Sequence, residues 1–380
     1  MSQVKAAARA GVYIHLPFCP YICPYCDFAK WPHRASQAQQ YLDALLAEID
    51  AAPDVAAETV FIGGGTPNTY APQIIADLVL KVRERFSLPA GAEITIEVNP
   101  DPDRCAGFAA YAAAGVTRLS IGAQSFDAAE LRTLGRQHSA RDIESAVTLA
   151  RAAGIGTVSL DLMFGTPGTS TACFESSLES AIATGVDHIS TYGLTIEPGT
   201  PYAGWFERSP RDFLDDEAEG ELYERAIARL GAAGFEHYEI SNFARPGRRC
   251  RHNENYWRNG DYLGLGVGAA SFLGGVRSVH SRSLEEYLEA ARAGAPIPGE
   301  SERLVGLART GEAAMLALRT VEGVNLHYFK ERYGVDFLEQ YGSAVDEMRD
   351  AGLLEVDHSR VALTRRGRFL ANDVCAAFIS

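Results

Sequence analysis

Three cysteines near the N-terminus are the side chains with the clearest capacity for chemistry. Cys19, Cys23 and Cys26 share one short segment with the spacing C-x3-C-x2-C. An odd trio this close does not fit a disulfide framework, and packed thiolates need a cation, so we expect a metal centre here. Zinc would require a fourth ligand, for which Asp27 and His33 are the nearest candidates. Three thiolates on a four-iron cluster would instead leave one iron with an open coordination position.

Polar or glycine-rich runs follow the other β-like segments of the first 240 residues. These runs are GGGTP (63–67), EVNP (97–100), GAQSF (122–126), FGTPG after Asp161, and YGLTIEPGTP (192–201). In a parallel α/β barrel the carboxyl ends of the strands meet at one rim, so we expect these runs to surround the cysteine segment. Turn chemistry alone is the alternative explanation for any single run.

The polar residues of these runs indicate a ligand with an amino-acid part and a nucleoside part. Glu97, Gln124 and Asp161 could bind an ammonium group or ribose hydroxyls, and Arg136 could pair with a carboxylate. The glycines of GGGTP allow close approach of backbone groups to a ligand. Because the run lacks the Lys-Ser/Thr of a phosphate-binding loop, a nucleoside triphosphate is disfavoured.

Alternating strand and helix patterns between residue 11 and about residue 240 must position these side chains. Strands are predicted at 11–16, 59–62, 94–98, 118–121, 158–163 and 188–194. Helices are predicted around 41–49, 72–86, 104–114, 141–153, 172–184 and 215–233. Six strand–helix units are too few for an eight-stranded barrel, so we predict an α/β fold with a partial (β/α)6 barrel.

The remaining chain is predicted to form an extension and a small C-terminal domain. The expected divisions are 1–240 for the barrel, 241–295 for the extension and 296–380 for the C-terminal domain, with a linker over 293–300. Short helices at 312–319, 325–332 and 337–351 followed by a hairpin at 353–363 predict a winged-helix-like order. The run GLGVGAA (264–270) lacks the context of a dinucleotide fingerprint and is interpreted as close backbone packing.

Composition narrows the function classes. The 380 residues include 49 Asp and Glu against 35 Lys and Arg, a net charge of −14 that disfavours general nucleic-acid binding. Seven cysteines are too few and too unevenly spaced for a secreted disulfide scaffold, and a thiolate centre favours a reducing compartment, so we expect a cytoplasmic protein. The first residues lack the apolar region of a signal peptide, and no run of eighteen apolar residues predicts a membrane span; peripheral membrane contact stays open.

From about residue 11 to residue 268 the chain resembles radical S-adenosylmethionine (SAM) proteins of the coproporphyrinogen III dehydrogenase-like group. The resemblance rests on the motifs YIHLPFC, C-x3-C-x2-C, IGGGTP, IEVNP, SIGAQSF, LGRQHS and DLMFGTPG, in that order. It implies that Cys19, Cys23 and Cys26 hold a 4Fe-4S cluster whose fourth iron is chelated by SAM, and that an electron donor reduces it. It also implies SAM-contacting positions at Tyr13, Phe28, Gly64, Gly65, Thr66, Glu97, Gln124, Arg136 and Asp161.

Two sequence features distinguish members of this group. The oxygen-independent coproporphyrinogen dehydrogenases carry a fourth cysteine two residues after the third, where this chain has Phe28. The run HNENYW (252–257) is similar instead to the HNxxYW motif of the HemW family of heme chaperones, which implies heme as ligand and heme-accepting proteins as partners. The runner-up function is an oxidative decarboxylase of a porphyrinogen, and a third is a zinc-stabilised binding module.

The heme motif offers several contacts. His252 is a candidate axial ligand, Tyr256 a candidate phenolate ligand, Trp257 a stacking face, and Asn253 a further contact. Cys250 is another candidate axial or covalent partner. The alternative is that His-Asn and Tyr-Trp hold an irregular loop by hydrogen bonds and aromatic packing. Cys105, Cys173 and Cys375 lie in helix-like surroundings and are expected to be core residues.

Overall fold

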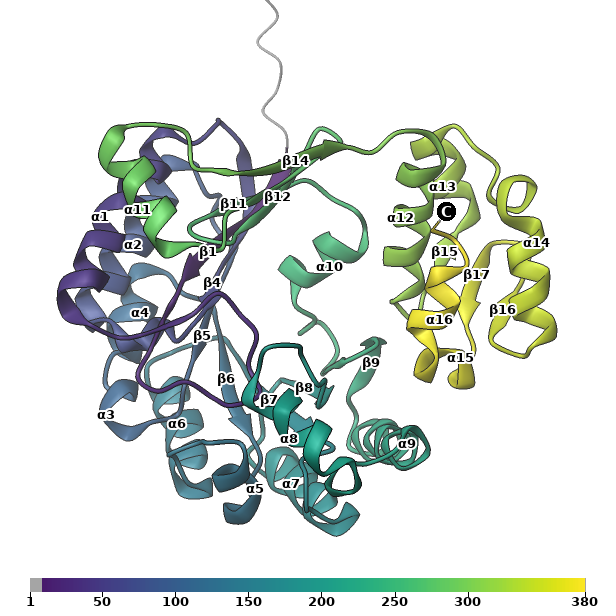
Figure 1. Ribbon diagram of the computed structural model, residues 1–380, viewed down its shortest axis with the longest axis horizontal. Helices are drawn as coiled ribbons and strands as arrows, with labels where there is room; N and C mark the ends of the chain where they lie inside the picture. Colours follow the sequence, from purple (N-terminus) through teal and green to yellow (C-terminus); the bar gives the residue numbers. More distant parts are fainter. Residues whose placement is uncertain (1–8, 380) are drawn as a thin grey trace, which may run out of the picture.

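Six β-α repeats build the first part of the computed structural model, which describes residues 9–379 (Figure 1). The repeats begin with strands β1 (Arg9–Leu16), β4 (Ala56–Gly64), β5 (Glu93–Val98), β6 (Arg118–Gln124), β7 (Thr157–Phe164) and β8 (His188–Gly193), which pair in parallel in this order. The predicted partial (β/α)6 barrel is therefore confirmed. The prediction that the first residues lack a signal peptide concerns residues outside the described part of the chain.

Helices cover the outer face of this curved sheet (Figure 1). They are α1 (Ala35–Ala51), α2 (Pro72–Arg85), α3 (Pro102–Cys105), α4 (Phe108–Ala114), α5 (Ala128–Thr133), α6 (Ala140–Ala152), α7 (Thr171–Ala183) and α9 (Asp216–Ala232). The helix α8 (Pro201–Arg208) packs instead against the cysteine segment, where the Tyr202 amide donates to the Pro24 carbonyl at 3.3 Å. The single helix predicted over 104–114 is wrong, because the chain makes two short helices, separated at Ala106 and Gly107. A Cβ on Gly107 would lie 2.9 Å from Pro72, so glycine is needed where α4 begins against α2.

Strand alternation explains which side chains face the barrel interior. In β1, Val12, Ile14 and Leu16 belong to the apolar core beneath the helices, so Tyr13 and His15 point to the opposite face. Helix α1 buries Tyr41, Leu42, Leu45 and Ile49, as its period predicts, while Leu46 is only partly buried.

Further strands extend both edges of the large sheet. β11 (Tyr262–Leu265) pairs in parallel with β1, and β12 (Ala270–Leu273), β13 (Val276–His280) and β14 (Gly299–Arg303) follow antiparallel. At the other edge, β10 (Asn242–Ala244) and β9 (Glu236–Glu239) continue from β8. The predicted linker over 293–300 is thus wrong at its end, because β14 is still a strand of the large sheet, reached from α11 (Leu284–Ala293).

Residues beyond β14 have an apolar core of their own. Their elements are α12 (Gly306–Leu318), β15 (Val324–Asn325), α13 (Leu326–Tyr333), α14 (Phe337–Asp350), β16 (Leu354–Val356), β17 (Arg360–Leu363), α15 (Arg365–Phe369) and α16 (Ala371–Ala376). The order helix, short strand, two helices and hairpin, with β17 between β15 and β16, matches the predicted winged-helix-like order. The domain limits themselves remain a prediction.

The helix α10 (Arg251–Trp257) carries the HNENYW run and lies between the barrel strands and α12 (Figure 1). The run is therefore a helix and not the irregular loop of the alternative interpretation. Asn, His, Tyr and Trp have modest helix propensity and the helix has only seven residues. Its stability therefore comes from packing on both neighbours, which local sequence does not reveal.

Candidate functional site

A cavity of about 320 Å³ lies where the carboxyl ends of the barrel strands meet. We name it the cysteine cavity. The predicted cluster and SAM residues that line it are Cys19, Cys23, Cys26, Phe28, Gly64, Gly65, Thr66, Glu97, Gln124, Arg136 and Asp161. The structure thus brings together positions that are up to 142 residues apart in the chain, from 19 to 161. Tyr13 does not line the cavity; its hydroxyl lies 2.9 Å from His15 Nδ1.

The cysteine segment is closed at its base by two short parallel strands. β2 (Phe18–Cys19) pairs with β3 (Trp31–Pro32), and the His33 amide donates to the Cys19 carbonyl at 2.8 Å. Inside this closed loop the Cys26 amide donates to the Cys23 carbonyl at 3.3 Å. The backbone therefore holds the three thiols on one wall of the cavity.

The thiol surroundings fit a multi-iron centre better than a single zinc ion. Among residues 9–379, no three His, Cys, Asp or Glu side chains are grouped so that they could hold one metal ion. Of the candidate fourth ligands, Asp27 pairs with Arg282 at 3.3 Å, and His33 packs edge-on against Phe18. Neither lines the cysteine cavity. Burial raises the pKa of the Cys19 thiol to about 11, so a cationic centre is needed to stabilise its thiolate.

The glycines of GGGTP are required first by the packing of the chain itself. A Cβ on Gly65 would lie 2.6 Å from the Pro17 carbonyl carbon, and one on Gly64, where φ is +107°, would lie 2.3 Å from the His15 ring. The Gly65 amide donates to the Leu16 carbonyl at 2.8 Å. The run therefore seats the cysteine segment on β4, while Gly64 and Gly65 still line the cavity.

Two carboxyl groups reach the cavity from neighbouring parts of the sheet. Glu97 accepts a hydrogen bond from the Gly64 amide at 3.0 Å, and Asp161 accepts from the Ser120 hydroxyl at 3.0 Å. Burial raises the pKa of Glu97 to about 7 and that of Asp161 to about 6, with the Asp161 charge adding to the rise at Glu97. A cationic or hydroxyl-bearing ligand would satisfy both groups.

Arg136 and Lys30 are the cationic side chains that line the cavity, and Arg136 is the one bonded to the strand ends. Its Nη2 donates to Asn99 Oδ1 and to the Gly122 carbonyl, both at 2.7 Å, and its Nη1 lies 3.6 Å from Cys23 Sγ. The guanidinium thus joins the cysteine wall to the strand ends and retains donors for an anionic ligand. Gln124 lines the same wall with φ at +64°, in the left-handed region, where β6 breaks its register with β7. Strain of this kind is concentrated at ligand sites.

Several lining residues are absent from the predicted set. They are Tyr21, Tyr25, Lys30, Val98, Asn99, Ser120, Gly122, Met163 and Tyr192. Asn99 and Gly122 stand inside the EVNP and GAQSF runs and could have been found there. Tyr21 and Tyr25 belong to the cysteine segment, but no spacing rule indicates that their rings turn toward a cavity.

The heme-motif residues occupy three different environments. His252 is fully buried, and its Nδ1 and Nε2 lie 2.8 Å from Thr59 Oγ1 and 2.9 Å from the Tyr256 hydroxyl. Burial lowers the pKa of His252 to about 3, so the ring is neutral. Asn253 lines a polar chamber of about 50 Å³ that shares Glu97, Ser120 and Asp161 with the cysteine cavity. Trp257 lines a separate and larger cavity toward the C-terminal helices.

In this conformation His252 and Tyr256 match the alternative in which the motif holds its segment in place. Both ring nitrogens of His252 are engaged, and neither side chain lines the cavity at Trp257. Cys250 is likewise buried, with its thiol 3.6 Å from Glu93 Oε1. Among the other cysteines, Cys105 and Cys375 are core residues as predicted, but Cys173 is only partly buried.

The described residues include no helix long and apolar enough to span a membrane.

Comparison with known proteins identifies the family of the chain. Residues 13–181 match the radical SAM superfamily, and residues 308–370 match the HemN C-terminal domain. A heme chaperone HemW of Bacillus subtilis is 34% identical over 97% of this chain and 99% of its own, and one of Mycobacterium tuberculosis is 38% identical over 96% and 93%. The fold is that of coproporphyrinogen III oxidase (HemN) from Escherichia coli, with a TM-score of 0.86 and 24% identity over 99% of this chain and 91% of the other.

The radical SAM domain is one that holds a 4Fe-4S cluster and SAM, which is the chemistry that the donor set of the cysteine cavity fits. The similarity to the two bacterial proteins extends through the C-terminal residues as well as the barrel. The chain therefore belongs to the radical SAM superfamily and, within it, to the HemW family.

Proposed function

We propose that this protein binds heme and passes it to acceptor proteins, and that it carries a SAM-chelated 4Fe-4S cluster while doing so. The observation that carries the proposal is the cysteine cavity itself, with three thiols and Phe28 where a decarboxylating relative has a fourth cysteine. Relatives that match nearly the whole chain bear the name heme chaperone HemW, which supports heme as the ligand here.

The residues of the cysteine cavity have distinct proposed roles. Cys19, Cys23 and Cys26 hold the cluster, and Gly64 and Gly65 present backbone groups to the amino-acid part of SAM. A further set comprises Thr66, Glu97, Gln124, Arg136 and Asp161, of which Glu97 suits the ammonium group and Arg136 the carboxylate. When reduced, the bound cofactors supply a 5′-deoxyadenosyl radical and methionine.

Tyr13 lies outside the cysteine cavity and contacts His15 rather than the ligand. Its hydroxyl bonds His15, whose Nε2 lies 2.7 Å from the Ala29 carbonyl in the cysteine segment. Tyr13 is therefore proposed as a positioning residue for that segment. A reducing compartment such as the cytoplasm belongs to the same proposal, because cysteine thiolates oxidise readily. An electron donor that reduces the cluster is part of the proposal as well.

Phe28 separates this proposal from porphyrinogen decarboxylation. Its side chain is 65% exposed and lines the cysteine cavity, so the position two residues after Cys26 supplies a hydrophobic ring and no thiol. The likeness to HemN, at 24% identity, extends to the fold alone.

A transfer assay tests the proposal. Anaerobically prepared protein with its cluster is given hemin, and movement of heme to an apo-acceptor is followed by absorbance. We expect saturable hemin binding and transfer faster than from free hemin. Absence of hemin binding would overturn the proposal. Turnover of coproporphyrinogen III with SAM and reductant would overturn it in favour of the enzyme.

A further inference from the structure

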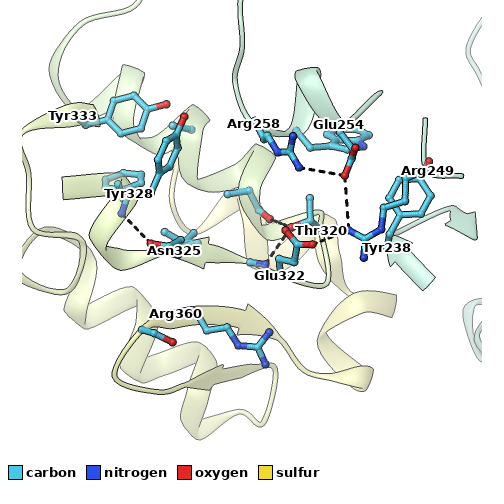
Figure 2. A pocket seen from close by; sticks show the side chains of 17 residues that line it. Tyr238, Arg249, Glu254, Arg258, Thr320, Glu322, Asn325, Tyr328, Tyr333 and Arg360 are labelled. Carbon is cyan, nitrogen blue, oxygen red and sulfur yellow. Dashed lines mark hydrogen bonds and ion pairs between the residues drawn. The ribbon is translucent and has the colours of Figure 1, made fainter. Parts of the chain in front are cut away.

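A second cavity of about 530 Å³ lies between α10 and the C-terminal helices. We name it the α10 cavity. Figure 2 shows Tyr328 and Tyr333 on one side and Glu254, Arg258, Arg249 and Tyr238 on the other. The α10 cavity and the cysteine cavity share no lining residue.

We propose that heme binds in the α10 cavity, with Tyr328 as axial ligand, Trp257 against a porphyrin face, and Arg258 and Arg360 paired with the propionates. This inference rests on the proposed function and assigns its site. The proposed heme site lies at the junction between the barrel and the C-terminal part, and not in the barrel interior.

The dimensions and walls of the α10 cavity suit a planar cofactor. Its volume falls within the roughly 300–1,000 Å³ of pockets that hold small molecules and cofactors. Apolar side chains line it from both parts of the chain, namely Trp257, Ala313, Ala317, Val324 and Phe329. Trp257 offers one ring face to Arg319, whose guanidinium carbon lies 5.4 Å from the ring centroid.

The α10 cavity offers cationic side chains to a ligand with carboxylates. The chain carries −14 overall, whereas three arginines and two glutamates line this cavity, so its lining carries one net positive charge. Arg258 is largely exposed and pairs with Glu254 at 3.3 Å. Arg360 pairs with Glu355 at 2.9 Å and with Asp357 at 3.5 Å, and it donates to the Val321 carbonyl at 3.3 Å. A guanidinium has five N–H donors, so each arginine can retain its present partners and still bind a propionate.

Tyr328 is the best placed ligand for the iron. No histidine, cysteine or methionine lines the α10 cavity within the described chain, so a tyrosine oxygen is the remaining ordinary axial ligand. The Tyr238 hydroxyl is buried and bonded to His188 at 2.8 Å, and the Tyr333 hydroxyl accepts from Asn259 at 3.3 Å. Tyr328 is 47% exposed, and Arg332 donates to its oxygen, which orients the phenol and leaves a lone pair free.

The rest of the HNENYW run then has a positioning role. His252 bonds to Thr59 of β4 and to Tyr256 on the next turn, so it fixes α10 to the barrel. That anchor sets the place of Trp257 and Arg258, the last residue of α10 and the one after it, at the cavity.

The test is a titration of the full-length protein with hemin and with iron-free protoporphyrin IX. We expect Tyr328→Phe to lose the phenolate–iron charge-transfer absorbance and the corresponding resonance Raman modes, with about tenfold weaker hemin binding and unchanged protoporphyrin binding. Tyr333→Phe, on the same helix and in the same cavity, is the matched control and should keep the phenolate signature.

The propionate contacts are tested with the double variant Arg258→Gln, Arg360→Gln. We expect it to bind both hemin and protoporphyrin about 10- to 100-fold more weakly, because charge-assisted hydrogen bonds are lost. Arg365→Gln is the charge control, since Arg365 is similarly exposed, pairs with Glu224 and does not line the cavity. Arg365→Gln should bind hemin as the unaltered protein does.

The outcomes distinguish a wrong site assignment from a wrong proposed function. If the unaltered protein binds hemin and all of the cavity variants bind it with the same affinity and spectrum, the α10 cavity assignment is wrong and the proposed function stands. If the unaltered protein binds no hemin, both are wrong. If His252→Gln removes the axial signature while Tyr328→Phe keeps it, the ligand is His252 and the axial assignment fails.

Discussion

His252 Nδ1 lies 2.8 Å from the Thr59 hydroxyl, a contact that joins the heme motif to the second barrel strand across 193 residues of sequence. Both side chains are buried, and the other ring nitrogen bonds the Tyr256 hydroxyl. The pair therefore defines where α10 stands relative to the barrel. The HNENYW run, which resembles a set of heme ligands, therefore also anchors α10 to the barrel through His252.

Replacing His252 by Ala should destabilise the fold. The change leaves the Thr59 hydroxyl without its buried partner and opens a cavity, so we expect a loss on the order of 2 kcal/mol or more in the free energy of unfolding. Denaturant unfolding of the cluster-free protein measures it. Tyr256→Phe, which removes one hydrogen bond and keeps the ring, should cost about 1 kcal/mol. Unchanged stability in His252→Ala would show that the contact does not hold α10.

Replacing any one of Cys19, Cys23 or Cys26 by Ala should abolish the iron–sulfur absorbance, because a thiolate ligand of the cluster is lost. Iron and sulfide analysis of anaerobically reconstituted protein gives the readout. Cys173→Ser is the matched control, since Cys173 is partly exposed and outside the cysteine cavity. Full iron content in Cys23→Ala would refute the proposed ligand set.

Replacing Gly65 by Ala should displace the cysteine segment. The new Cβ would meet Pro17 backbone atoms at 2.6 to 2.8 Å, so we expect about 1–3 kcal/mol of destabilisation and reduced cluster content. Thermal unfolding and iron counting measure the two effects. Gly231→Ala is the control, because its Cβ meets nothing within 4 Å and its helical position favours alanine. Equal behaviour of the two variants would contradict the packing argument.

The affinity for SAM should depend on pH through Glu97. Its pKa in the free protein is about 7, and only its anionic form pairs well with an ammonium group. Affinity should therefore be highest above this pKa and fall as pH decreases through it, approaching about tenfold per pH unit. Calorimetric titration of the cluster-containing protein across this range measures the slope. Glu97→Gln should bind SAM more weakly and with a flatter profile; an unaltered slope would assign the titration to another group.

The reconstituted protein should not convert coproporphyrinogen III when given SAM and reductant. The expectation rests on Phe28, which occupies the wall of the cysteine cavity where decarboxylating relatives carry a further cysteine. Product analysis by chromatography provides the measurement, with SAM cleavage recorded in the same samples. Stoichiometric or greater turnover would replace the chaperone by the enzyme.

The sequence alone determined the barrel and most of the cysteine cavity. Period-two and period-3.6 patterns are local properties of the chain, so they identified the six strands and most of their helices, except where Gly107 divides one helix into two. Parallel strands bring their carboxyl ends to one rim, so polar runs after strands converge without knowledge of the coordinates. Glu97, Gln124 and Asp161 were predictable for that reason.

Tertiary structure alone decided how the heme motif is used. Side-chain direction on a seven-residue helix depends on what packs against it, and α10 packs against β4 on one side and α12 on the other. His252 therefore points inward to Thr59, whereas Trp257 reaches a cavity completed by Tyr328 of α13. No spacing in the sequence relates Trp257 to Tyr328, because the cavity that both residues line forms only when the C-terminal core packs beside the barrel. Local pattern selects the elements, and the packing between distant elements selects which side chains meet.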